Sequence, residues 1–425
     1  MKFPPYETYV QSKLSWLDEI PNGWDVIPIK FGLEIPITDG PHETPEIFNE
    51  GIPFLSAESV KKDKLDFSRK RGFISIEEHK RFSKKYKPKR GDVYMVKSGA
   101  TTGNMARVET DREFNIWSPL AAMRPDTEML TTDFLFFFMK SKPFFHSVEL
   151  NWNYGTQQNI GMGVIANLQM ALPPVAIQKK IASFLEHKTQ QINRLIKKKK
   201  ELIEKLEEQR TAIITQAATK GIDENAKLKP SGVDWLSDVP EHWDVRRLKF
   251  MASIQNGRDY KDVEVEEGGY PVYGSGGEFR RSSQYLYEGE SVLFGRKGTI
   301  DKPLYVNCRF WTVDTMFYSE ILANTVAKFL YYSALTFQYQ KLATQTALPS
   351  ITQHDLENYT LTYPCKEEQI LIVNYLDEQS RKIKEMITVS KEAIEKLEEY
   401  RSAIITSAVT GKIDVREVVI PKEVE

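Results

Sequence analysis

Residues 173–223 read PPVAIQKKIASFLEHKTQQINRLIKKKKELIEKLEEQRTAIITQAATKGID, and residues 364–414 read PCKEEQILIVNYLDEQSRKIKEMITVSKEAIEKLEEYRSAIITSAVTGKID. The second stretch repeats the first without a gap. Each copy begins with a Pro, has a Gly close to its end, and carries apolar residues three or four positions apart. This pattern predicts one long helix in each copy.

An apolar stripe follows each predicted helix and predicts that the two helices pair. Steps that alternate between three and four residues are typical of a coiled-coil seam, although Lys188, Lys199 and Gln209 interrupt the series. A helix of about forty residues is about 60 Å long, too long for the core of one compact domain, so we expect a spacer that sets a fixed distance. The stripe residues are Ile181, Leu185, Ile192, Leu195, Leu202, Leu206, Ile213 and Ala217, then Ile372, Leu376, Ile383, Met386, Ala393, Leu397, Ile404 and Ala408.

The repeat continues outside the helices. Residues 16–31, WLDEIPNGWDVIPIKF, recur as residues 235–250, WLSDVPEHWDVRRLKF. The offset is 219 positions here and 191 between the helices, so the first intervening block is 28 residues longer than the second. Constant flanks around unequal middles indicate two exchangeable modules on one frame. We expect a first module at 1–172, helices at 173–223 and 364–414, a linker at 224–234, a second module at 235–363 and a tail at 415–425.

Both modules have the composition of α+β domains, with Gly and Pro between short strand-like runs. The second module begins after the first helix and ends at the start of the second helix, so the helices should be antiparallel, with residues 3–31 near the end of the second. Strands are expected at 53–56, 92–96, 106–108, 168–172, 270–273, 291–294, 304–307 and 359–363. Helical segments are expected at 132–141 and 326–335.

Composition limits the possible functions. The chain has no apolar run long enough to span a bilayer and no signal-peptide core in its first residues, which favours a cytoplasmic protein without a membrane partner. Its cysteines, Cys308 and Cys365, lie outside any metal-binding spacing. The net charge is −1, but thirteen Lys and Arg residues crowd into residues 61–90. A solvated surface is the simplest interpretation of that run, and clustering on one face would instead indicate anion binding.

Motifs that would indicate catalysis are missing. The sequence has no GxxxxGK[ST] loop, HExxH motif or GxSxG elbow, and its six histidines are scattered. We therefore predict no catalytic residue and no metal ligand in this chain.

Polar loops rich in small residues occur at matching places in the two modules. Gly lets the backbone approach a surface closely, Thr, Ser and Lys suit phosphate oxygens, and Gln, Asn and Arg can read base edges. Ordinary turns are the alternative for any single loop, and recurrence in both modules favours DNA binding. The candidate DNA-binding residues are Lys97, Ser98, Thr101, Thr102, Asn104, Thr156, Gln157, Gln158 and Asn159 in the first module, and Arg296, Lys297, Thr299, Thr344 and Gln345 in the second.

Three features resemble the specificity subunit (HsdS) of type I restriction-modification systems. They are the repeated WL..IP..W flanks, the loops KSGATTG and YGTQQNI, and helices entered through LPP…Q that end in IEKLEE.R…IIT.A.TGKID. The resemblance covers nearly the whole chain. It implies two target-recognition domains on an antiparallel coiled coil, each binding one half of a split site in double-stranded DNA. It also implies two methyltransferase subunits and restriction subunits as partners. S-adenosylmethionine, ATP and Mg²⁺ would belong to those partners, and this chain would hold no cofactor.

Two other functions remain open from the residues. The chain could serve a system whose nuclease is fused to the methyltransferase, or it could be a coiled-coil scaffold for two protein-binding modules. Near-neutral charge favours the scaffold, and the recurrent polar loops with Arg and Lys favour DNA.

Overall fold

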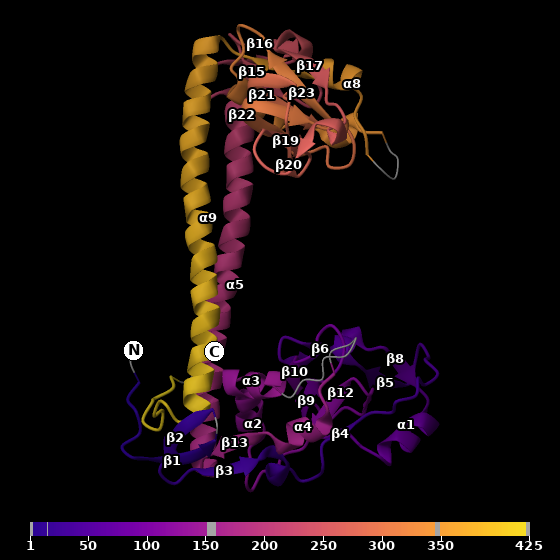
Figure 1. Cartoon of the computed structure of the whole chain (residues 1–425), viewed down its shortest axis with the longest axis vertical. Coiled ribbons are helices and arrows are strands. Elements are labelled where there is room, and N and C mark those ends of the chain that lie inside the picture. The colour runs from indigo at the N-terminus through magenta and orange to yellow at the C-terminus, as the bar shows by residue number, and fades with distance from the viewer. Residues whose placement is uncertain (1–2, 15, 151–158, 345–348, 422–425) are drawn as a thin grey trace. The chain divides into compact units, whose positions relative to one another are not determined.

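The computed structural model describes residues 3–14, 16–150, 159–344 and 349–421. The chain separates into two compact units, one made of Met1–Lys198 with Glu392–Glu425 and the other of Lys199–Lys391. Each unit therefore contains one recognition module together with part of each long helix. Figure 1 labels the elements of both units.

The two repeated stretches form the long helices α5 (Val175–Lys220) and α9 (Lys366–Val409). In the first unit, the early part of α5 shares an apolar core with the late part of α9, and Arg401 Nη1 donates to Asn193 Oδ1 at 2.5 Å. In the second unit, the late part of α5 shares a core with the early part of α9. The helices are antiparallel in both units, and the predicted α+β class with two modules and paired long helices is confirmed.

Thirteen of the sixteen predicted stripe residues are buried or half-buried, and the other three are not. Leu195, Leu202 and Met386 are exposed, so these three assignments were wrong. The burial also follows isoleucines at every eleventh position, each buried or half-buried: Ile181, Ile192, Ile203 and Ile214 on α5, and Ile372, Ile383, Ile394 and Ile405 on α9. An eleven-residue repeat has 3.67 residues per turn, against 3.5 for heptads, so a heptad count drifts off the buried face after a few turns.

The first module is built from short strands and short helices. Its main sheet has the order β10-β9-β12-β4, and a smaller sheet has the order β11-β5-β8. The strands are β1 (Tyr9–Leu14), β2 (Leu17–Pro21), β3 (Asp25–Pro28), β4 (Thr38–Asp39), β5 (Ile52–Leu55), β6 (Val60–Lys61), β7 (Lys64–Leu65), β8 (Gly72–Ile74), β9 (Val93–Val96), β10 (Met105–Arg107), β11 (Asn115–Ile116), β12 (Leu120–Met123) and β13 (Gln169–Leu172). The helices are α1 (Ile76–Ser83), α2 (Thr132–Met139), α3 (Lys142–Leu150) and α4 (Met162–Asn167), with 3-10 turns η1 (Ile29–Gly32), η2 (Ala57–Ser59) and η3 (Phe67–Arg69).

The second module has one seven-stranded sheet in the order β17-β23-β21-β22-β19-β20-β18. Its strands are β14 (Leu228–Pro230), β15 (Asp238–Pro240), β16 (Asp244–Arg247), β17 (Ala252–Asn256), β18 (Glu264–Val265), β19 (Tyr270–Gly274), β20 (Gly277–Ser282), β21 (Tyr287–Gly295), β22 (Leu304–Thr312), β23 (Met316–Ile321) and β24 (Thr360–Tyr363). The helices are α6 (Ala327–Ala334), α7 (Tyr339–Leu342) and α8 (Gln353–Glu357), with 3-10 turns η4 (Leu248–Phe250) and η5 (Lys261–Val263). Strand β14 lies inside the segment expected to be a linker.

The two modules share a frame despite their different sequences. The order β4-β12-β9-β10 in the first corresponds to β17-β23-β21-β22 in the second. In each module, the strand that leads into the long helix pairs with the strand that follows the repeated Trp, as β13 with β3 and as β24 with β16. Every strand and helical segment expected from the sequence overlaps an observed one.

Both long helices end on a tryptophan of the repeated flank. Gly221 and Gly411 adopt left-handed backbone conformations, with φ of 78° and 71°, and each lies against an indole ring, that of Trp243 or Trp24. Near the end of α9, the Asp414 N–H donates to the Pro4 carbonyl at 2.7 Å. Figure 1 shows β1 and β2 beside this end of α9. The predicted position of residues 3–31 is thus confirmed. Gly221 lies one position later in its copy of the repeat than Gly411 does, and both glycines have the same left-handed conformation.

The eleven-residue seam leads to a prediction about two neighbouring residues. Ile192 is 4% exposed and Leu195 is 50% exposed, although the heptad pattern placed both in the seam. We expect Ile192→Ala to lower the free energy of unfolding by about 2–5 kcal/mol, because it leaves a cavity between the helices. Leu195→Ala, its matched control, should change it by less than about 0.5 kcal/mol. Urea denaturation measures both, and equal losses would contradict the observed seam.

Candidate nucleic-acid interface

In the first module, the structure brings the two predicted loops together. The loop after β9 contains Lys97 to Asn104, and Ser98 forms an antiparallel bridge with Asn159. The Ile160 N–H donates to the Lys97 carbonyl at 2.8 Å. Two segments that are about sixty residues apart in sequence therefore form one polar edge. Thr156, Gln157 and Gln158 lie outside the described residues.

The loop after β9 is a tight connection between β9 and β10. Val96 and Asn104 pair across its base, and Gly99 and Gly103 take φ values of 103° and 93°, which favour glycine. The Thr102 hydroxyl donates to the Gly99 carbonyl at 2.6 Å and stabilises the turn. Thr101 and Asn104 remain exposed, while Ser98 and Thr102 are half-buried. The exposed tip thus presents small polar groups on a defined backbone.

Lys97 points into the first module. Its side chain is only 11% exposed, and Nζ lies 3.4 Å from Oδ2 of the buried Asp39. Lys85 Nζ donates to the other oxygen of the same carboxylate at 2.5 Å. A buried carboxylate requires such partners, so Lys97 anchors the loop base through its charge. Sequence reasoning grouped Lys97 with the exposed loop residues and missed Asp39.

The second module repeats the same pairing of loops with other side chains. Lys297 forms an antiparallel bridge with Ser350, and the Ile351 N–H donates to the Arg296 carbonyl at 2.9 Å. Gly295 permits this turn, because a Cβ there would lie 2.1 Å from the Thr299 carbonyl oxygen. The bonds Ile160 to Lys97 and Ile351 to Arg296 are equivalent in the two modules.

The second loop carries more exposed positive charge than the first. Lys297 and Thr299 are exposed, and Arg296 is half-buried, with Nη1 donating to the Asp314 carbonyl at 3.3 Å. Thr344 joins the same edge, since its N–H donates to the Ser350 carbonyl at 2.9 Å. Gln345 lies outside the described residues. The structure therefore groups Arg296, Lys297, Thr299 and Thr344.

About half of the thirteen cations in the basic run at residues 61–90 are paired with acidic residues. Acidic partners from the described residues lie within 4 Å of seven of its cations: Lys64, Arg69, Arg81, Lys85, Lys87, Lys89 and Arg90. Arg71 lies over the Trp117 ring at 4.1 Å. This surface is one of mixed charge, which agrees with the simplest interpretation of the run.

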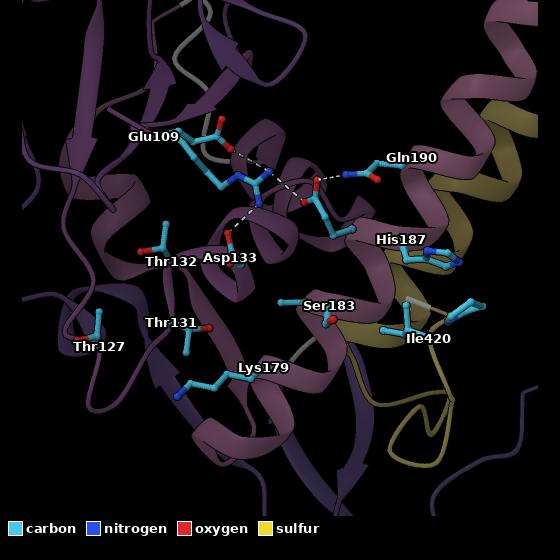
Figure 2. A pocket seen from close by; sticks show the side chains of 14 residues that line it. Glu109, Thr127, Thr131, Thr132, Asp133, Lys179, Ser183, His187, Gln190 and Ile420 are labelled. Atoms are coloured by element: carbon cyan, nitrogen blue, oxygen red, sulfur yellow. Dashed lines mark hydrogen bonds and ion pairs between the residues drawn. The ribbon is translucent and has the colours of Figure 1, made fainter. Parts of the chain in front are cut away.

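An open pocket of about 910 Å³ lies between the first module, α5 and the C-terminal tail. Glu109, which Figure 2 labels, lies 3.6 Å from Nη2 of Arg107. Arg107 Nη1 lies 2.7 Å from Asp133, and Nη2 lies 3.0 Å from Glu186 of α5. Burial opposes the charged form, but Glu186 and Asp133 outweigh it and keep the pKa of Arg107 above its usual value. At this pocket, the ion pairs of Arg107 connect the first module to α5.

Two further findings concern cofactors and membranes. Across the residues that the structure describes, no three His, Cys, Asp or Glu side chains are grouped so that they could hold a metal ion. Nor does any helix in the described ranges have the length and apolarity needed to cross a bilayer.

The fold and the loops define a class of protein with two α+β modules attached to one pair of antiparallel helices. Each module presents two polar loops that pair with each other at one edge. The family model for the type I restriction modification DNA specificity domain matches residues 25–205 and 240–396. The chain therefore belongs to the type I restriction-modification DNA specificity family, with one copy of the domain in each half.

Relatives and solved structures agree with this assignment. The chain is 24% identical to the putative type I restriction enzyme MjaX specificity subunit of Methanocaldococcus jannaschii, over 95% of this chain and 97% of the relative. It is 25% identical to the MjaVIII specificity subunit of the same organism, over 64% and 70%. A chain from a type I restriction-modification assembly has a TM-score of 0.74 at 17% identity, covering 93% and 99%. The HsdS subunit of Thermoanaerobacter tengcongensis has a TM-score of 0.55 at 17% identity, covering 93% and 98%.

The exposed cations of the second loop lead to a prediction. If Lys297 contacts phosphate, Lys297→Ala should weaken DNA binding for all sequences alike and reduce the salt slope by about one. If Arg296 reads a guanine, Arg296→Ala should cost about 1–3 kcal/mol and relax one base position. Binding of the assembled complex at fixed salt measures both, with the exposed Lys227→Ala as control. Unchanged affinity in both loop variants would remove this loop from the interface.

Proposed function

We propose that this chain is the DNA-recognition subunit of a type I restriction-modification complex and binds a bipartite site in double-stranded DNA, one half-site per module. The supporting observation is that the same two-loop edge is built twice on a repeated frame, with unlike side chains at its tip. Repetition of the backbone fits a common task, and variation of the side chains fits two different targets.

The unlike loops imply an asymmetric target. The first edge presents Thr101 and Asn104, which are uncharged, while the second presents Lys297 beside Arg296. Side chains that differ in charge and hydrogen-bonding groups favour different base edges. We therefore expect two different half-site sequences separated by an unread spacer.

Catalysis belongs to partner subunits in this proposal. The chain docks two methyltransferase subunits, and restriction subunits join them for cleavage. S-adenosylmethionine, ATP and Mg²⁺ are bound by those partners, and all components act in the cytoplasm. The missing nucleotide and metal motifs support a non-catalytic role for this chain.

The scaffold function is the second candidate, and one observation favours it. Phe31 and Phe250 occupy equivalent positions in the repeated flanks and are 63% and 55% exposed. A large exposed aromatic side chain suits a protein interface. The recurrence of an exposed Phe in both flanks fits a partner protein present in two copies. Such a partner is also compatible with the DNA-recognition role.

Exchange of the second module tests the proposed function. Cross-strand pairing of Asp244 with Tyr363 brings the two ends of the module together, so a replacement from Trp243 to Pro364 should retain the frame. With the equivalent module of a relative, we expect one half-site to change and the other to remain. Methylome sequencing of cells that express the chimera with its methyltransferase measures this.

The unmodified chain serves as the control and should give one bipartite motif. A chimera in which both half-sites change would contradict the assignment of one half-site to each module. A wild-type chain that directs no sequence-specific methylation would contradict the DNA-recognition function itself.

A further inference from the structure

A buried glutamine joins the first module to its long helix. Gln178 lies in the first turns of α5 and is fully buried. Its Oε1 accepts a hydrogen bond from the Thr131 N–H at 2.8 Å. Its Nε2 donates to the carbonyls of Met129 and Pro173, both at 2.8 Å. The amide thus ties the segment before α2 to the residues that precede α5.

The second module has the same joint. Gln369, which is 191 positions after Gln178, is also fully buried. Its Oε1 accepts from the Val326 N–H at 2.8 Å, and its Nε2 donates to the carbonyls of Asn324 and Pro364 at 3.2 and 2.9 Å. Val326 and Asn324 precede α6 as Thr131 and Met129 precede α2. Each of the three hydrogen bonds of Gln178 therefore has an equivalent hydrogen bond at Gln369.

The contacts of these glutamines use only main-chain atoms among the described residues. Thr131 and Val326 are the N-cap residues of α2 and α6, whose N–H groups need an acceptor outside the helix. Each glutamine supplies that acceptor from the long helix. Because the main chain is the same for every sequence, the joint can hold modules whose side chains differ.

A second contact of each joint is specific to its module. Glu186 of α5 pairs with Arg107 of β10 at 3.0 Å. At the equivalent position of α9, Asp377 pairs with Lys328 of α6 at 2.6 Å and accepts from the Tyr332 hydroxyl at 2.7 Å. The long helix contributes an acidic side chain to both joints, but the module residues that bind this side chain differ between the two joints. This contrast separates a shared part of the joint from a variable one.

We propose that Gln178 and Gln369 are positioning residues that fix the orientation of each recognition module on its helix and thereby set the register of its half-site. The inference rests on the proposed DNA-recognition function. A buried amide with all three bonds satisfied resists displacement, since its removal leaves the Thr131 or Val326 N–H without an acceptor. A module that rocks on its helix still reads its own bases but holds them at a less defined distance from the other half-site.

The test uses the assembled complex with its methyltransferase subunits and a series of duplexes whose spacers differ by single base pairs. We expect Gln178→Met and Gln369→Met each to lower the ratio of the methylation rate on the natural spacer to the rate on neighbouring spacers by about tenfold. This size is reasonable because a misplacement of about 1 Å can cost about a hundredfold in rate. Discrimination between bases within each half-site should remain. Loss of folded protein alone would lower all rates together and leave the spacer ratio unchanged.

Gln191→Met is the matched control, because Gln191 is exposed on the same helix and contacts His187 and Lys188 of its own helix. Phe54→Leu in the core of the first module controls for lost stability. If a Met variant does not assemble, Gln178→Asn and Gln369→Asn replace it, since their shorter amides cannot span the same three groups.

Hydrogen exchange gives a second readout on the full chain. The Thr131 amide should exchange faster in Gln178→Met, and the Val326 amide in Gln369→Met, with the other joint unaffected. A wild-type complex without spacer preference would contradict the proposed function. A wild-type complex with a sharp preference that the assembled variants of Gln178 and Gln369 retain would overturn this inference alone.

Discussion

The burial of isoleucine between α5 and α9 is the interaction on which the other features depend. Each helix is far longer than a module can cover, and most helical stability in proteins comes from packing of an apolar face. Isoleucines at every eleventh position contribute to that face on both helices, together with other buried residues such as Leu185, Leu206 and Leu376. Because the pattern has 3.67 residues per turn, close to the natural period of a helix, the seam runs along each helix with little winding.

The modules attach to the helices at defined points. A module strand leads directly into the first turn of each helix, where a buried glutamine holds the segment before α2 or α6. The other end of each helix terminates on the Trp of a repeated flank. The position of each candidate interface loop therefore depends on a series of contacts that connects the loop's module to the packed helices.

Much of this arrangement could be predicted from the sequence because the chain contains two copies of one repeat, which can be compared with each other. Fixed offsets of 219 and 191 between the copies identified the frame, the modules and the antiparallel order, and the loops at Lys97 and Arg296 stood out because they recur after equivalent strands. Gln178 and Gln369 also recur at the second offset, so the same signal could have found their joint. Their role needed the structure, since their partners are main-chain atoms that no sequence pattern specifies.

Other features could not be predicted from local patterns. Leu195 and Leu202 fit a heptad, and the eleven-residue alternative is visible only when burial shows which of several adjacent apolar residues faces the partner helix. Lys97 belongs to a polar loop by composition, yet the buried Asp39, some sixty residues earlier, draws its side chain inward. The direction of a side chain depends on charges brought in by the fold.

The claim that the helix pair sets the distance between half-sites can be tested by lengthening both helices together. Two eleven-residue blocks inserted after Lys198 in α5 and again after Lys391 in α9 preserve the seam and add about 33 Å at ~1.5 Å per residue. That length corresponds to about ten base pairs, one turn of B-DNA, so a site lengthened by one full turn presents its two halves on the same faces of the duplex as before. We predict that the assembled variant methylates sites whose spacer is about ten base pairs longer. Undiminished preference for the original spacer in a folded, assembled variant would contradict the account.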